Sequence, residues 1–289
     1  MNKQENILFI VEGKRLEPDV IRRMEKVYGL HCDISSVSTN IYNLYRQLKK
    51  DDGYSDVTEV LKDSFRSQLD SLEGLGFNKE RQIEINRIKE ELSLLDRPFA
   101  SIYLVFDSDL QHRSDDTTDK MTIVNNNIAE LNDMLEFFSN ETEQGKLYVN
   151  YPMMESYRDC EDYFDKNYRD RLVSLDVLFG ETQAKGYKAT VESTKLARVH
   201  IRKITEEQFN RLTCMNVFKL NWMTNHVWEK PSYDDFLVQS QQDAILALEA
   251  QSCRNLQVVS VLNTLLFFIV DYKGRDFYDC DILPGLRES

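Results

Sequence analysis

Short apolar runs alternate with helical periodicity in the first half of the chain. Residues 7–11 and 102–106 are the two strongest runs, and both are rich in β-branched or aromatic residues. Uninterrupted runs of this length are typical of central strands in a parallel sheet, which are buried on both faces. Two weaker strands are predicted at 32–38 and 147–151.

Between the strands, apolar residues recur at the spacing of amphipathic helices. Pro18 suits the first turn of a helix after the first strand, and a second helix is predicted at 41–48. Residues 57–72 and 85–95 predict a charged helical hairpin, with Gly74 and Gly76 between its two helices. A further helix is predicted at 124–138. Strands alternating with helices indicate right-handed crossovers and an α/β fold with a parallel sheet flanked by helices.

The second half of the chain lacks a comparable series of strands and is predicted to be mostly helical. Ser232 is a candidate N-cap of one helix, and the apolar run near 258–270 is predicted to be a buried helix, too short to span a bilayer. We therefore expect a catalytic domain over 1–157, with a helical insertion at about 52–97, and a helical domain over 158–289.

Composition limits the classes of function. The formal charge is −13 and the pI is about 4.9, which argues against a general basic surface for nucleic acid. The five cysteines are scattered, without CxxC pairs or histidines at ligand spacing, which disfavours disulfides and zinc. The first residues lack the apolar core of a signal peptide. These features predict a cytoplasmic protein without a membrane segment.

Acidic residues follow three of the predicted strands. Glu12 follows the first, Asp107 and Asp109 follow the run at 102–106, and Glu155 lies shortly after 147–151. The carboxyl ends of parallel strands share one edge of a sheet, where ligands bind. Crowded carboxylates repel one another unless a cation neutralises them, and oxygen ligands without Cys or His favour Mg²⁺ or Mn²⁺. Lys14 and Arg15 are candidates for contacts to a substrate phosphate.

The motifs VEGKRLEP and VFDSD, which contain Glu12 and Asp107, resemble the Toprim pattern of strand-Glu-Gly followed later by strand-Asp-x-Asp. Their local form is similar to that of RloB-like Toprim proteins of prokaryotic defence loci. In outline they also resemble the Toprim effectors of ATPase-coupled defence systems such as PARIS. The resemblance covers roughly residues 5–157, interrupted by the helical hairpin.

The resemblance implies a role for each matching residue. Glu12 becomes a metal ligand or general acid/base, Glu17 a second acid of the same motif, and Asp107 and Asp109 a metal-binding pair. The stretch NYPMME loosely resembles an NPxxE-like segment and makes Glu155 a further candidate ligand. The implied catalytic set is Glu12, Asp107, Asp109 and Lys14.

The implied activity is Mg²⁺- or Mn²⁺-dependent cleavage of RNA, possibly tRNA, or DNA, as the effector of an anti-phage system. The implied partner is an ABC- or SMC-like ATPase, and a homodimer suits cleavage of two strands. The alternative is a non-hydrolytic subunit docked on an ATPase or sensor. Each acid also has a purely structural interpretation: Glu12 and Glu155 as helix caps, Asp107 and Asp109 as turn residues, and Glu17 as a partner of a helix dipole.

Overall fold

The structure is a computed structural model that describes residues 6–49, 56–73, 78–112, 118–180 and 186–282. Its centre is a five-stranded sheet in the order β2-β1-β3-β5-β4. The strands are β1 (Ile7–Val11), β2 (Cys32–Ser36), β3 (Ser101–Asp107), β4 (Ser139–Asn140) and β5 (Gly145–Asn150). β1, β2, β3 and β5 run parallel, and only the short β4 is antiparallel. The predicted α/β fold is therefore confirmed, and the four parallel strands end at one edge.

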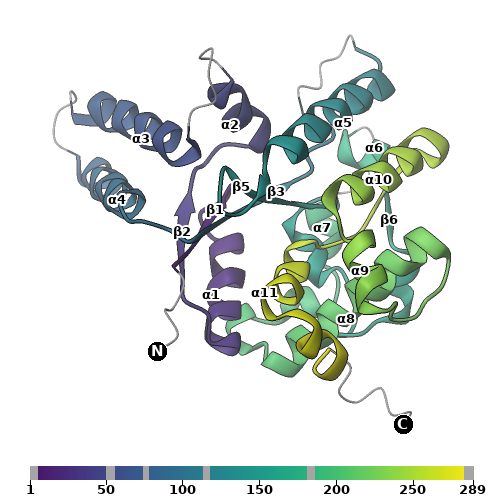
Figure 1. The fold of residues 1–289 in the computed structure, drawn as a ribbon. Helices are drawn as coiled ribbons and strands as arrows, with labels where there is room; N and C mark the ends of the chain where they lie inside the picture. Colours follow the sequence, from purple (N-terminus) through teal and green to yellow (C-terminus); the bar gives the residue numbers. More distant parts are fainter. Residues whose placement is uncertain (1–5, 50–55, 74–77, 113–117, 181–185, 283–289) are drawn as a thin grey trace.

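Helices cover both faces of this sheet (Figure 1). α1 (Leu16–Tyr28) and α11 (Leu265–Cys280) lie on one side, and α2 (Ile41–Leu48) and α5 (Lys120–Phe137) lie on the other. The β1 side chains explain this arrangement, because all five are buried. A strand with two apolar faces is stable only when both faces are covered.

The predicted helical hairpin consists of α3 (Val57–Glu73) and α4 (Lys79–Leu95), which lie beside the β2 edge of the sheet (Figure 1). α4 starts before the predicted position because the Asn78 side chain caps it, accepting the backbone N–H of Glu80 at 2.8 Å. The hairpin is tied to β2 by a hydrogen bond of 2.7 Å from Ser35 to Glu91. The predicted turn at Gly74 and Gly76 lies outside the described residues.

The second half of the chain is mostly helical, as predicted. Its α-helices are α6 (Leu175–Leu178), α7 (Tyr187–Val191), α8 (Glu206–Asn225), α9 (Tyr233–Gln239), α10 (Gln242–Leu256) and α11. Its short 3-10 helices are η1 (Met154–Arg158), η2 (Lys166–Asp170), η3 (Leu196–Arg198) and η4 (Ile201–Lys203). Ser232 caps α9 as expected, because its side chain accepts the backbone N–H of Asp235.

The prediction of one helix near 258–270 is wrong. Val258–Ser260 instead forms β7, which pairs with β6 (Leu172–Ser174), and α11 begins only at Leu265. Tertiary hydrogen bonds explain the break: Thr264 donates its N–H to Asn150 Oδ1 at 3.0 Å and its hydroxyl to the carbonyl of Val149 at 2.9 Å. A continuous apolar run carries no periodicity that could have distinguished these two elements.

One hydrophobic cluster contains buried residues from both predicted domains. Phe268 of α11, for example, packs edge-on against Phe9 of β1 and Tyr103 of β3. The second half therefore contributes directly to the core around the sheet. In the part of the chain that the structure describes, no helix has the length and apolar character needed to cross a bilayer.

Candidate active site

The carboxyl edge of the parallel sheet gathers the five acids that the sequence singles out. Glu12 directly follows β1, Asp107 ends β3, and the chain after β5 turns into η1, which contains Glu155. Glu17 lies in the first turn of α1. Asp109, Glu12, Glu17 and Glu155 all raise the pKa of Asp107 through their charges. We call Glu12, Glu17, Asp107, Asp109 and Glu155 the carboxylate cluster.

Glu12 has no hydrogen-bond partner for one of its oxygens. Oε2 is buried and unpaired. Burial, followed by the charges of Asp109 and Glu17, raises the pKa of Glu12 to about 7. A buried oxygen without a donor is costly, so this carboxylate is better suited to receive a cation than to cap a helix.

Glu17 is buried against the turn that carries Glu12. A Cβ atom at Gly13 would lie 2.4 Å from Glu17 Oε2, so the Glu17 carboxylate occupies this position only because residue 13 has no side chain. Burial is the main cause that raises the pKa of Glu17, and the charge of Glu155 adds to it. An acid that only favoured the helix dipole would be more stable in water, where its charge is solvated.

Asp107, the last residue of β3, and Asp109, two residues later, differ in their hydrogen bonds and backbone conformation. Asp107 Oδ1 accepts the backbone N–H of Met154 at 2.7 Å, which links the end of β3 to the segment that carries Glu155. Burial raises the pKa of Asp107 well above its usual value. Asp109 has φ of 40°, in the left-handed region that Asp tolerates better than most residues. This bend places Asp109 at the same edge of the sheet as Asp107. Burial also raises the pKa of Asp109.

Sequence reasoning missed a lysine at this cluster. Lys188, in α7, places Nζ 3.3 Å from Glu155 Oε1. Its charge acts to lower the pKa values of Glu12, Glu17 and Asp109. Lys188 lies 79 residues after Asp109 in a five-residue helix, and no local motif marks it. Only the tertiary fold could reveal this contact.

Lys14, the predicted phosphate contact, is turned toward the helical hairpin. Its Nζ lies 3.3 Å from Glu84 Oε1 in α4, and the Lys14 side chain is half exposed. The structure therefore brings the five acids together with Lys188 and places Lys14 in a different ion pair.

The chemistry of the cluster fits a hard divalent cation, because every candidate ligand atom is a carboxylate oxygen. Within the described ranges, no group of three or more His, Cys, Asp or Glu side chains is arranged to hold a metal ion as it stands.

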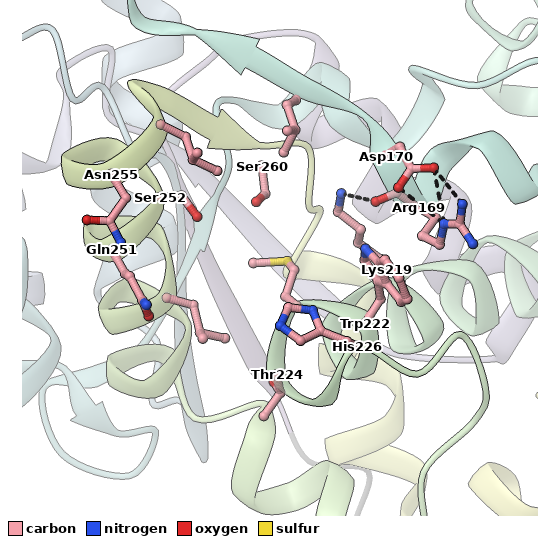
Figure 2. Close-up of a pocket in the computed structure, with 14 residues that line it drawn as sticks. Arg169, Asp170, Lys219, Trp222, Thr224, His226, Gln251, Ser252, Asn255 and Ser260 are labelled. Carbon is pink, nitrogen blue, oxygen red and sulfur yellow. Dashed lines mark hydrogen bonds and ion pairs between the residues drawn. The ribbon is translucent and has the colours of Figure 1, made fainter.

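A separate cavity of about 510 Å³ lies between α8, α10 and the β6–β7 pair (Figure 2). Lys219 lines it, and its Nζ donates to the carbonyls of Arg169 at 2.6 Å and Arg171 at 3.1 Å. None of the five acids of the carboxylate cluster lines this cavity. Lys219 connects α8 to the chain between η2 and β6, and we assign it a structural role.

No protein-family model, no curated protein and no solved structure matches this chain. The Toprim resemblance therefore rests on the two motifs and on the placement of their acids.

Proposed function

We propose that the protein is a Mg²⁺- or Mn²⁺-dependent endonuclease. The observation that carries this proposal is the convergence of five acids, with the pKa values of Glu12, Glu17, Asp107 and Asp109 raised, at the carboxyl edge of the parallel sheet. Structural carboxylates are normally paired or solvated, whereas groups held in mutual repulsion are typical of functional sites.

Glu12, Asp107 and Asp109 are the proposed metal ligands, and Glu17 and Glu155 complete the site. When bound, a divalent cation polarises a scissile phosphate and activates water. The chain's own residues position these ligands: Gly13 allows Glu17 to approach the first motif, and the Met154 N–H fixes Asp107. Lys14 remains a candidate for phosphate contact, because its exposed ion pair with Glu84 can be replaced by one with a phosphate.

The substrate class is RNA, including tRNA, or DNA. A net charge of −13 slows the approach of a polyanion, so we propose that a partner provides basic surface. By the Toprim resemblance, that partner is an ABC- or SMC-like ATPase of an anti-phage system in the cytoplasm, and a homodimer suits cleavage of both strands.

Asp107→Asn tests the proposed activity. The amide keeps an oxygen for the Met154 N–H but removes a charged ligand, so metal-dependent cleavage should fall by about 100-fold or more. Asp33→Asn is the matched control, because Asp33 lies on β2 of the same sheet, outside the carboxylate cluster, and pairs with Arg97 at 2.9 Å. Cleavage is measured on labelled RNA and DNA with Mg²⁺, Mn²⁺ or EDTA, with and without the proposed ATPase partner. Equal cleavage by Asp107→Asn and wild type would contradict the proposal.

An interaction subunit without hydrolytic activity is the second candidate. The helical hairpin is its proposed docking surface, and Ile83 of α4, a large apolar residue that is 62% exposed, is the residue to test there. Absence of metal-dependent cleavage together with loss of ATPase binding on Ile83→Asp would support this function instead.

A further inference from the structure

We infer that Lys188 is the counter-ion of the carboxylate cluster in the metal-free protein and that a bound divalent cation displaces its ammonium group. Lys188 would then set the metal affinity of a site whose other residues lie before residue 157. This inference rests on the proposed metal-dependent function and adds a residue from the region after 157.

The contacts of Lys188 carry the inference. Its Nζ lies 3.3 Å from Glu155 Oε1, and its charge also acts on Glu12, Glu17, Asp107 and Asp109. Burial opposes the charge on Lys188, but the acids, led by Glu155 and Asp107, outweigh burial and raise its pKa. The ammonium group thus partly compensates a cluster that would otherwise have only negative charge.

The backbone that carries Lys188 is anchored independently of the acids. The neighbouring Tyr187 is buried, and its hydroxyl donates to Asp159 Oδ2 at 3.2 Å. The Lys188 side chain itself is 63% exposed, whereas that of Glu155 is 10% exposed. The flexible side chain can therefore swing into solvent while α7 stays in place.

Electrostatics make the two cations mutually exclusive. Charges of the same sign a few ångströms apart repel each other, and partial burial of the site strengthens the repulsion. A divalent ion among these carboxylates replaces the compensation that Lys188 provides, and Lys188 also withholds Glu155 as a ligand. Removing the ammonium group should therefore strengthen metal binding.

Calorimetric titration with Mn²⁺ tests this inference on the full chain at neutral pH. Lys188→Met removes the charge and retains a long side chain, and it should lower the Mn²⁺ dissociation constant by about tenfold. Lys188→Arg retains the charge and should bind Mn²⁺ like wild type. Lys195→Met is the matched control, because Lys195 is 78% exposed and its ion pair is with Glu161, outside the cluster. Thermal unfolding of each protein verifies that it is folded.

The outcomes separate the inference from the proposed function. Tighter binding by Lys188→Met alone, or binding that appears only in this variant, would support the inference. Mn²⁺ binding with equal constants in wild type, Lys188→Met and Lys188→Arg would overturn it and leave the proposed function standing. Weaker binding by Lys188→Met would also overturn it, since Lys188 would then assist the metal. If none of the folded proteins binds Mn²⁺, the metal-dependent function fails, and the inference fails with it.

Discussion

Two of the regions in which the protein buries charge are built on opposite principles. The carboxylate cluster gathers five like charges and leaves Glu12 Oε2 without a partner. The second region, at the cavity beside α8, combines unlike charges: Lys219 and Glu249 act on each other, Lys219 donates to two carbonyls, and Glu249 accepts the Ser260 N–H at 2.9 Å. Both regions carry a desolvation cost, and in each a carboxylate oxygen, Glu12 Oε2 or Glu249 Oε1, has no hydrogen-bond partner. In the second region one buried acid is matched by one buried lysine, whereas in the first region five acids share the largely exposed Lys188.

This difference separates a region suited to binding from a region that holds the fold together. Removing one partner of a buried pair of unlike charges destabilises the folded state. Crowded like charges, in contrast, destabilise the folded state until a ligand binds. Substitutions that remove charge should therefore act in opposite directions on the free energy of unfolding in the two regions.

The largest effect is expected at Lys219. Lys219→Met leaves the carbonyls of Arg169 and Arg171 without this donor and leaves Glu249 buried without its cation, so the free energy of unfolding should fall by about 3 kcal/mol. Urea unfolding measures this loss. Adding Glu249→Gln should recover part of it, because the remaining buried charge is then removed. A Lys219→Met protein as stable as wild type would contradict the proposed difference between the two regions.

A smaller, opposite effect is expected from pH at the carboxylate cluster. Acids whose pKa values are raised on folding bind more protons in the native state, so the free energy of unfolding should fall as pH rises from about 5 to 8 in metal-free protein. Glu12, with its pKa raised to about 7, should contribute to this fall. Asp107→Asn should weaken the dependence and stabilise the protein by about 1 kcal/mol at neutral pH, since it removes one of the repelling charges.

The measurement is chemical unfolding at several pH values, with EDTA and with saturating Mn²⁺. The measurement is made in proteins that also carry Glu249→Gln. Burial raises the pKa of Glu249 to about 7, so Glu249 would also make the free energy of unfolding fall as pH rises. Stability that rises with pH in this background would contradict the repulsive cluster.

The smallest effect is expected at Gly13. An added Cβ would lie 2.4 Å from Glu17 Oε2, and a carboxylate at the end of a flexible side chain can rotate away. Gly13→Ala should therefore alter Mn²⁺ affinity by roughly threefold, or about 0.7 kcal/mol, with little change in stability. Gly180→Ala is an unsuitable control because its φ is positive; Gly186→Ala has open space and ordinary backbone geometry. Equal Mn²⁺ affinity in Gly13→Ala and wild type would remove Glu17 from the set of ligands.

The sheet was predictable because its central strands are marked locally. Residues 7–11 and 102–106 are uninterrupted apolar runs, and the acids after them share an edge as a direct result of parallel strands. The placement of Glu12, Asp107 and Asp109 at one edge follows from this geometry. Their role as metal ligands stays a prediction.

Features that depend on contacts between distant segments were not predictable. Lys188 joins the cluster because Asp159 holds Tyr187, and nothing around residue 188 indicates that contact. The division of 258–270 into β7 and α11 depends on Asn150 and Val149, more than 100 residues earlier. Local periodicity contains no information about such partners.

The hydrogen bonds of Asn263 have a consequence for the order in which the site forms during synthesis. Asn263 Nδ2 donates to the Met154 carbonyl and to Ser156 Oγ, both at 3.1 Å, and so holds the Met154 backbone and the Ser156 side chain, which flank Glu155. A chain made from its N-terminus contains all five acids long before this asparagine leaves the ribosome. A nascent chain therefore lacks the hydrogen bonds that flank Glu155 until residue 263 is in place, so the carboxylate cluster is completed only when most of the polypeptide exists.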